Sequence, residues 1–324
     1  MLRDNFNRVI NYLRVSVTDR CNLHCRYCSD KDLPFTPHDD ILRYEEILRF
    51  VRIAATLGVQ KVRLTGGEPL SRRGITFLIG EINSIEGITD ISLTTNGVYL
   101  GERVTELKEA GLGRVNISLD TLKRDRFSYI TGVDVFDRVI ASIEKAKELG
   151  LEPIKINTVI IKGFNDDEIL DFALFAREMA LQVRFIEFMP FGSDGLWDAS
   201  KVVHSSAIEE LLRAHHDLTP LANTDRGPAT MFKINGSPGK VGFISPMSTH
   251  ICAECNRIRL TPDGKLKPCL FSDDEYDLKA LLRGGAGDDE IRRFVTDIVR
   301  AKPERKFGGG QIRKCQRSMR NTGG

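Results

Sequence analysis

Short apolar segments rich in β-branched residues alternate with longer amphipathic segments through the first part of the chain. The strand-like segments are 13–17, 61–65, 91–95, 114–118, 154–160 and 183–188. Apolar residues fall at helical spacing in the segments between them, which are 44–58, 73–84, 102–111, 136–150 and 166–180. Strands separated by helices form βαβ units, whose strands are parallel and whose crossovers are right-handed. The pattern therefore predicts an α/β fold built on a parallel sheet.

Three architectures satisfy this pattern: a closed barrel, a doubly wound sheet and an open barrel of six units. The count of six strands favours the incomplete six-unit (β/α) barrel. After Phe188 the rhythm changes, and the next 130 or so residues hold short strand-like pieces and a few helices. We therefore predict a partial barrel over residues 1–200, a smaller α+β domain over 201–310 and a Gly-rich tail over 311–324.

The charge of the chain is nearly balanced, with 47 Lys and Arg against 45 Asp and Glu among 324 residues. This balance demands neither a nucleic acid nor a membrane as partner. The first residues lack an apolar signal core, and no window approaches 18 apolar residues, so we expect a cytoplasmic protein. Residues 291–320 hold ten basic and two acidic residues. They form either a solvated surface or one that attracts a polyanionic ligand.

Cys21, Cys25 and Cys28 lie within eight residues, in the segment TDRCNLHCRYCSD that follows the first strand. In a reducing compartment, clustered thiols indicate metal binding rather than disulfides. Three thiolates satisfy three corners of a four-iron cluster and leave one iron open to an exchangeable ligand. A structural zinc site takes four protein ligands, so zinc would need His24 or a distant residue as the fourth. The spacing favours the iron–sulfur interpretation.

A second group of cysteines lies far along the chain, with Cys252 and Cys255 followed by Cys269. A zinc ribbon completed by His250 is one interpretation of this spacing. The other is a second cluster with an open iron, because this group also stops at three thiols. Cys315, in the basic tail, is interpreted as a bystander thiol.

The segment RLTGGEPL follows the second predicted strand and contains Gly66, Gly67 and Glu68. Paired glycines let a ligand approach the backbone closely, and the carboxylate of Glu68 can accept hydrogen bonds from an ammonium group. The carboxyl ends of parallel strands meet at one edge of the sheet, where such folds place their active sites. The cysteine loop and this turn are therefore predicted to share that edge.

The motif Cys21-x3-Cys25-x2-Cys28, the GGEP turn and the six βα units resemble the radical S-adenosylmethionine (SAM) enzymes. The second cysteine group, the segment RIRLTPDGKLKPCL and the final Gly-Gly narrow the resemblance to the GTP 3',8-cyclase family. That family catalyses the first step of molybdenum cofactor biosynthesis. The likeness runs from LRVSVTDRCN to NTGG. It implies that GTP is converted to (8S)-3',8-cyclo-7,8-dihydroguanosine 5'-triphosphate through a 5'-deoxyadenosyl radical.

The resemblance implies a [4Fe–4S] cluster on Cys21, Cys25 and Cys28 whose open iron binds SAM. By similarity, SAM is also bound by four further residues, which are Tyr27, Gly67, Ser118 and Met189. Read without the family, Ser118 and Met189 would be assigned to ordinary packing inside the barrel.

The resemblance also implies a second [4Fe–4S] cluster on Cys252, Cys255 and Cys269, which binds the guanine end of GTP. Arg257 and Arg259 are expected to act in catalysis and, because they alternate on one strand, to point to one face. The matching GTP contacts are Arg14, Lys61, Arg63, Thr94, Lys155, Arg184, Arg257, Ile258 and Arg259. Charges inside apolar strands are costly unless they are paired, so a lumen that binds an anion explains them; for Lys61, an outward-facing strand end is the alternative.

The terminal Gly323 and Gly324 look like a frayed tail, but the resemblance implies that they insert toward the active site. Here the sequence departs from the family pattern. Thr322 replaces an aliphatic residue, Lys306 replaces a frequent histidine, and the third cysteine is followed by Ser-Asp instead of Met-Pro. None of these changes is expected to touch a ligand position.

The family further implies an electron donor such as flavodoxin or ferredoxin, and cyclic pyranopterin monophosphate synthase as the next enzyme. A monomer or homodimer is expected. Two alternatives remain open. One is a radical SAM enzyme with an auxiliary cluster that modifies a peptide, and the other is a zinc-binding module without catalysis.

Overall fold

The computed structural model describes residues 1–28, 34–191, 196–222, 227–249, 252–306 and 315–323. All named strands belong to one twelve-stranded sheet, in the order β12-β11-β10-β1-β2-β3-β4-β5-β6-β9-β8-β7. Their bounds are β1 (Tyr12–Ser16), β2 (Lys61–Thr65), β3 (Asp90–Thr95), β4 (Arg114–Ser118), β5 (Ile154–Ile160), β6 (Gln182–Glu187), β7 (Leu218–Pro220), β8 (Thr230–Ile234), β9 (Lys240–Ile244), β10 (Arg257–Leu260), β11 (Lys265–Lys267) and β12 (Tyr276–Asp277). The six predicted strands are confirmed within one residue at each end.

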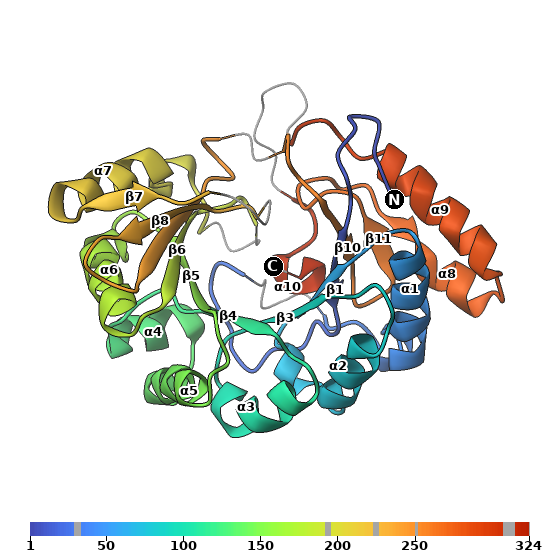
Figure 1. The fold of residues 1–324 in the computed structure, drawn as a ribbon, viewed down its shortest axis with the longest axis horizontal. Coiled ribbons are helices and arrows are strands. Elements are labelled where there is room, and N and C mark those ends of the chain that lie inside the picture. Colours follow the sequence, from blue (N-terminus) through green and yellow to red (C-terminus); the bar gives the residue numbers. More distant parts are fainter. Residues whose placement is uncertain (29–33, 192–195, 223–226, 250–251, 307–314, 324) are drawn as a thin grey trace.

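The helices that follow the strands cover the outside of the sheet (Figure 1). Their bounds are α1 (Tyr44–Thr56), α2 (Ile75–Asn83), α3 (Leu100–Glu109), α4 (Arg124–Thr131), α5 (Phe136–Glu148), α6 (Ile169–Glu178), α7 (Ser205–His215), α8 (Leu278–Arg283) and α9 (Asp288–Arg300). A further helix, α10 (Met319–Thr322), lies on the inner side of the sheet (Figure 1). The five predicted helical segments correspond to α1, α2, α3, α5 and α6. The sequence pattern missed α4. Within the described ranges, no helix combines the length and apolar character needed to cross a membrane.

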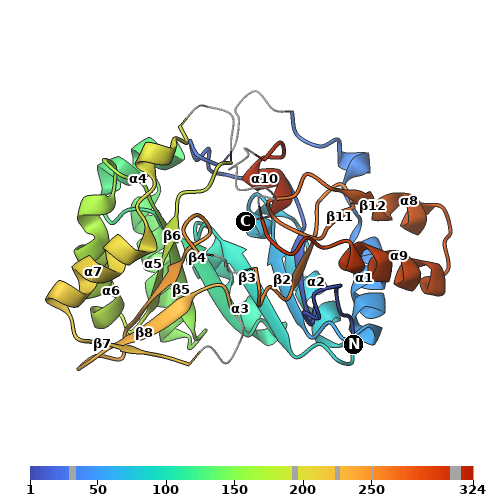
Figure 2. The same ribbon diagram turned by 90° about the horizontal axis from the view of Figure 1, so that it is seen from above.

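The sheet is an open arc rather than a closed barrel (Figure 1). Strands β1 to β6 are parallel neighbours, β10 pairs in parallel with β1, and β9 pairs in parallel with β6. Strands from the C-terminal part thus extend the partial barrel at both edges. Its inner side faces α10 and the last described residues of the chain (Figures 1 and 2). The domain limits at 200 and 310 stay a prediction.

Alternate residues of each strand point to opposite faces of the sheet. Leu13, Val62, Leu93, Val115 and Ile156 are fully buried and belong to the hydrophobic core. The same core contains the apolar faces of the surrounding helices. The apolar strand positions therefore pack against the helices outside the sheet, and the polar positions between them face its inner side.

Candidate active site

Three arginines lie side by side on the inner face of the sheet. Arg14 of β1 is in register with Arg259 of β10 on one side and with Arg63 of β2 on the other. All three line one pocket. Alternation within each strand turns these arginines to the same face, and the pairing of β1 with β10 and β2 brings them side by side. Arg257 lies two residues before Arg259 on β10 and lines the same pocket, as the alternation along the strand predicts.

These guanidinium groups perturb one another. Burial and the nearby Arg257 lower the pKa of Arg259 to about 10. Burial, followed by the charges of Arg259 and Arg63, lowers the pKa of Arg14 well below its usual value. A lowered pKa means that the charged form is less stable here than in water. A polyanion placed against this row would stabilise it, because phosphate oxygens pair well with guanidinium groups.

The opposite wall of the pocket is polar too. Arg184 of β6 and Asn157 of β5 are neighbours in register and line the pocket. Lys155 of β5 and Thr94 of β3 flank Asn116 of β4 in register. Among the described residues, the Thr94 hydroxyl and the Asn157 amide oxygen are buried without a hydrogen-bond partner. Buried polar atoms without partners indicate a place where a ligand can bind.

The second cysteine group forms one end of this pocket. Cys252, Cys255 and Cys269 all line it, together with Lys306. The Lys306 peptide N–H donates to Cys252 Sγ at 3.4 Å, and Arg257 donates to the Cys255 thiol. The expectation that Lys306 lies away from every ligand position is therefore wrong. Local sequence patterns do not reveal this contact, because Lys306 and Cys252 are 54 residues apart in the chain.

Arginine and lysine charges favour the thiolate of Cys255. Burial raises the pKa of this thiol, but the positive charges of Arg257 and Lys302 outweigh burial and bring it to about 6. Lys302 is almost fully buried, and its Nζ donates to the Arg257 carbonyl at 2.9 Å. A thiolate is the form that binds metal. The neighbouring cations therefore favour the metal-binding form of Cys255.

The first cysteine group lies on the loop after β1. The Cys28 peptide N–H donates to the Cys25 carbonyl at 3.0 Å, so the loop turns tightly between these cysteines. Cys21 Sγ accepts hydrogen bonds from the Leu23 N–H at 3.4 Å and from the Asn96 amide at 3.7 Å. Burial raises the pKa of Cys21 to about 11 and that of Cys28 to about 12. Unlike Cys255, these thiols need the charge of a bound metal to ionise near neutral pH.

The Gly66-Gly67 turn packs directly against the cysteine loop. A Cβ on Gly67 would lie 2.3 Å from the Arg20 carbonyl oxygen, and one on Gly66 would lie 2.5 Å from that of Thr18. Gly66 also has a φ of 158°. Only glycine lets the two loops approach this closely. The predicted meeting of the two motifs at one edge of the sheet is confirmed.

Glu68 is fully buried and is held by the neighbouring loops. Its carboxylate accepts hydrogen bonds from the Leu70 N–H at 2.9 Å, the Thr95 hydroxyl at 2.8 Å and the Asn96 N–H at 2.7 Å. Burial raises its pKa to about 7 despite these bonds. Through Asn96, which also donates to Cys21, Glu68 positions the cysteine loop. Its role in the described structure is this positioning.

Besides Gly67 in the glycine turn, the residues predicted to bind SAM come from separate segments of the chain. The Tyr27 hydroxyl donates to the Asp120 carboxylate at 2.5 Å, and its ring meets Phe188 edge to face at 6.4 Å. Ser118 is the last residue of β4, and Met189 lines the arginine-rich pocket. Asp120, which fixes Tyr27, was not predicted from the sequence.

The end of the chain enters the pocket region. Arg259 Nη1 donates to the Gly323 carbonyl at 2.6 Å, and Met319 lines the pocket. The Thr322 hydroxyl donates to the Ser318 carbonyl at 3.0 Å, so this departure from the family pattern is accommodated inside the tail. Gly324 lies outside the described residues, as does His250 of the zinc interpretation. The described part of the tail is packed rather than frayed.

Four of the predicted GTP contacts are not among the residues that line the pocket, namely Lys61, Thr94, Lys155 and Ile258, and neither is Cys315. The Ile258 side chain is fully buried in the core on the outer face, between Arg257 and Arg259, so only its backbone could face the pocket. Lys61 is half-buried at the start of β2 and is not among the residues that line the pocket. Cys315 is buried, and its N–H donates to the Pro190 carbonyl at 3.2 Å.

The donor sets fit iron–sulfur clusters. Among the described residues, no three His, Cys, Asp or Glu side chains are arranged to hold a metal ion, so the fit rests on the number and kind of donors. All six motif cysteines are free thiols and partly exposed. Sulfurs of both groups accept hydrogen bonds from N–H groups, an arrangement that tunes cluster thiolates.

Comparison with known proteins identifies the family. A model of the radical SAM superfamily matches residues 15–176, and a model described as Molybdenum Cofactor Synthesis C matches residues 181–307. The GTP 3',8-cyclase of Thermodesulfovibrio yellowstonii is 48% identical over 326 residues, which covers 100% of both chains. This chain belongs to the GTP 3',8-cyclase family. The family member from Moorella thermoacetica is 49% identical over 304 residues, covering 93% of this chain and 94% of the relative.

Among solved structures, Streptococcus suis SuiB bound to S-adenosylmethionine has a TM-score of 0.61 and 19% sequence identity. The match covers 88% of this chain and 68% of SuiB. At this identity the likeness concerns the fold alone, and it confirms the incomplete barrel of the radical SAM type. The GTP 3',8-cyclase family, as part of the radical SAM superfamily, implies SAM and a [4Fe–4S] cluster as cofactors.

Sequence reasoning missed several residues that line the site of this GTP 3',8-cyclase family member. Asn157 is on the same inward alternation as Lys155, so the period of two along β5 could have revealed it. Lys302 and Phe271 carry no such signal, because they lie in segments without regular periodicity. They reach the pocket only through the tertiary packing of the C-terminal part.

Proposed function

We propose that this chain is a radical SAM GTP 3',8-cyclase, which converts GTP to (8S)-3',8-cyclo-7,8-dihydroguanosine 5'-triphosphate. One observation carries the proposal beyond family membership. Three half-buried cysteines and five arginines line the same pocket, the arginines being Arg14, Arg63, Arg184, Arg257 and Arg259. A site for a peptide has no need of so many cations, whereas a nucleoside triphosphate brings three to four negative charges.

GTP binding is assigned to the two walls of this pocket. We assign the triphosphate to the row of Arg14, Arg63 and Arg259, whose mutual repulsion an anion relieves. We assign the guanine to the end that holds Cys252, Cys255 and Cys269, with Arg257 beside it. Thr94, Lys155 and Arg184 complete the list of proposed contacts. The proposed contacts also include the backbone of Ile258 and the side chain of Lys61, which is half-buried at the start of β2.

SAM binding is assigned to the cysteine loop and its surroundings. Cys21, Cys25 and Cys28 would hold the first cluster, and Tyr27, Gly67, Ser118 and Met189 would contact SAM. When bound, the cluster and SAM supply a radical that removes a hydrogen atom from the ribose of GTP. The chain contributes orientation: Asp120 fixes Tyr27, and Glu68 with Asn96 fixes the loop. Met189 and Met319 line the pocket and help exclude water from it.

A second [4Fe–4S] cluster is proposed on Cys252, Cys255 and Cys269. The lowered pKa of Cys255 and the N–H donor to Cys252 support it. The rival interpretation as a zinc module predicts colourless protein that contains zinc. Two clusters predict brown protein with about eight irons per chain after anaerobic reconstitution.

GTP binding provides the test of the substrate proposal. We expect GTP to bind the reconstituted protein, and Arg259→Met to weaken binding at least about tenfold through the loss of a charged contact. Arg52→Met is the matched control, because Arg52 is exposed on α1 and 3.7 Å from Glu81. Isothermal titration without reductant measures binding apart from chemistry. Equal GTP affinity in Arg259→Met and the native chain would contradict the assignment, and absence of GTP binding would favour the peptide-modifying alternative.

The remaining partners come from the family resemblance. We propose flavodoxin or ferredoxin as electron donor and cyclic pyranopterin monophosphate synthase as the next enzyme. A cytoplasmic location and a monomer or homodimer stay predictions, as does the absence of nucleic-acid and membrane partners. The tail residues Gly323 and Gly324 are proposed to complete the active site.

A further inference from the structure

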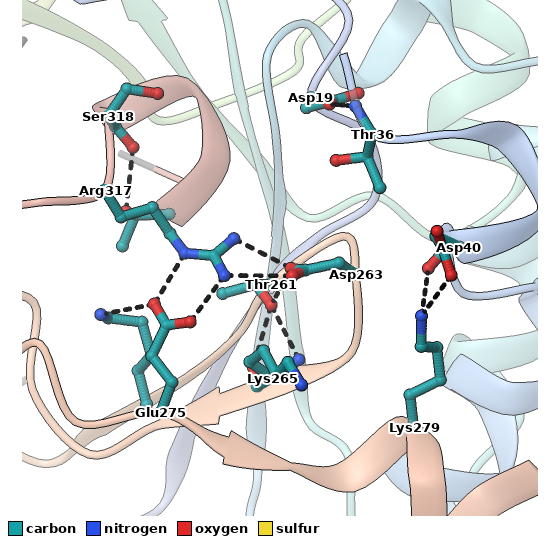
Figure 3. Close-up of polar contacts among 12 residues, drawn as sticks. Asp19, Thr36, Asp40, Thr261, Asp263, Lys265, Glu275, Lys279, Arg317 and Ser318 are labelled. Carbon is teal, nitrogen blue, oxygen red and sulfur yellow. Dashed lines mark hydrogen bonds and ion pairs between the residues drawn. The ribbon is translucent and has the colours of Figure 1, made fainter. Parts of the chain in front are cut away.

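Arg317 joins the tail to the body of the protein by four hydrogen bonds to two carboxylates. Its guanidinium donates to both oxygens of Asp263, at 2.9 and 3.0 Å, and to both oxygens of Glu275, at 2.6 Å each. Figure 3 shows the guanidinium between the two acids. The side chains of all three residues are about four-fifths buried, with 20–22% exposed. Bidentate, largely buried pairs of this kind are stronger than surface ion pairs.

The two carboxylates are themselves fixed. Asp263 lies in the turn between β10 and β11, where it accepts a hydrogen bond from the Thr261 hydroxyl at 2.6 Å. Glu275 also accepts from Lys267 Nζ at 3.0 Å, and Lys267 is 2% exposed. Lys267 lies two residues before Cys269. Two acids and two bases therefore form a balanced cluster, the Arg317 latch. On the body side, Asp263 and Lys267 belong to the β10–β11 hairpin before Cys269, and Glu275 follows Cys269 just before β12.

The residues just after Arg317 make contacts at both cysteine groups. The Arg320 peptide N–H donates to the Cys28 thiol of the first group, and its guanidinium stacks over the Phe35 ring at 4.6 Å. Three residues later, the Gly323 carbonyl accepts from Arg259 at 2.6 Å, beside the second group. Arg320 is buried, with 6% exposed. A short tail segment thus meets both ends of the site.

We propose that Arg317 is a positioning residue that holds residues 315–323 in the site, so that Arg320 reaches the first cysteine group while Gly323 reaches Arg259. Arg317 itself touches neither the pocket nor a motif cysteine. It acts by setting where the tail begins, within six residues of Gly323. The placement of the tail is independent of the proposed function, whereas its consequence for GTP turnover rests on that function.

The placement is tested on the metal-free chain by hydrogen–deuterium exchange of peptides that cover residues 315–323. Arg317→Met keeps the aliphatic stem and removes the charge, and we expect tail exchange to rise at least about tenfold, as expected for the loss of a strong ion-pair network. Asp263→Asn removes one carboxylate from the body side and should raise exchange in the same peptides. Arg300→Met is the matched control, because Arg300 is exposed on α9 and pairs with Asp297 at 3.6 Å. In Arg300→Met, residues 315–323 should exchange at the same rate as in the native chain.

Exchange of the tail within about twofold of the native rate in both Arg317→Met and Asp263→Asn would overturn the proposal. So would an equal rise in Arg300→Met, because the effect would then not be specific to the latch.

A second measurement concerns the loaded enzyme. We expect Arg317→Met to keep its iron content and SAM affinity while forming less cyclised nucleotide per 5'-deoxyadenosine, because the tail no longer closes the pocket. An unchanged product ratio would overturn the role in turnover. Failure of the native enzyme to cyclise GTP would instead refute the proposed function and leave the exchange result standing.

Discussion

Replacing Gly323 with alanine is expected to displace the tail from the site without unfolding the rest of the protein. Gly323 has a φ of 76°, in the left-handed region. A Cβ at this position would lie 2.7 Å from Thr65 Cγ2 and 3.0 Å from Ser16 Cβ. Thr65 and Ser16 end β2 and β1 and are almost fully buried, so neither can move aside easily.

The cost of this substitution can be worked from two contributions. A non-glycine residue in the left-handed region costs about 1–2 kcal/mol. Overpacking against a fixed neighbour costs about 1–3 kcal/mol. The sum of about 2–5 kcal/mol acts against the docked tail alone, and at tenfold per 1.4 kcal/mol it lowers the equilibrium constant for docking by about 30- to 4,000-fold. We therefore expect turnover of GTP to fall to a small fraction of the native value.

Gly285→Ala is the matched control for this substitution. Gly285 has a φ of 79°, but a Cβ there would meet nothing within 4 Å. It carries the same backbone strain without the clash and lies between α8 and α9. Hydrogen–deuterium exchange of residues 315–323 and the rate of GTP cyclisation measure the two effects together. Native exchange and native turnover in Gly323→Ala would refute the reasoning, because the tail would then tolerate a side chain where the structure leaves no room.

Three further outcomes are expected. Cys269→Ser should lower the iron content from about eight to about four per chain and impair GTP turnover while SAM binding is kept; loss of SAM binding as well would indicate a shared structural role. In the metal-free chain at pH 7, Cys255, with a pKa brought to about 6 by neighbouring cations against the effect of burial, should be about 90% thiolate and react with iodoacetamide before Cys21. Arg257→Met should slow the reaction of Cys255, whereas equal rates in the variant and the native chain would show that the charge of Arg257 does not affect ionisation of Cys255. Asn96→Ala removes a hydrogen bond to Cys21 Sγ and should shift the reduction potential of the first cluster to more negative values, as followed by spectroelectrochemistry; an unchanged potential would show that this contact has no electronic effect.

Much of the barrel was predictable because its signals are local. The strand of residues 154–160 is marked by its own β-branched residues, and the helix that begins at Tyr44 by its own amphipathic pattern. The helix over Arg124–Thr131 was missed, because its eight residues are largely polar and follow a strand closely. The pairing of β10 with β1 was also missed. It joins residues some 245 positions apart, and no local pattern encodes such a contact.

The candidate site shows the same division. Cysteine spacing marked the two cysteine groups, and the alternation within β10 predicted that Arg257 and Arg259 share one face. That Arg259 lies beside Arg14 depends on the pairing of β10 with β1. Lys306 was misjudged, because its contact with Cys252 depends on how the chain returns after α9. Arg317 gave no signal at all. In the sequence it is one of ten basic residues near the end of the chain, and only its two carboxylate partners distinguish it.

If GTP is the substrate, formation of the 3',8 bond requires that the hydrogen atom at its ribose 3' position is removed in the site. Reconstituted enzyme, SAM and a reductant can be incubated with GTP that carries deuterium at this position. Mass spectrometry should then find one deuterium in the 5'-deoxyadenosine formed, together with an equal amount of cyclised nucleotide. Formation of unlabelled 5'-deoxyadenosine, at the same rate with and without GTP and with the GTP recovered intact, would contradict the claim.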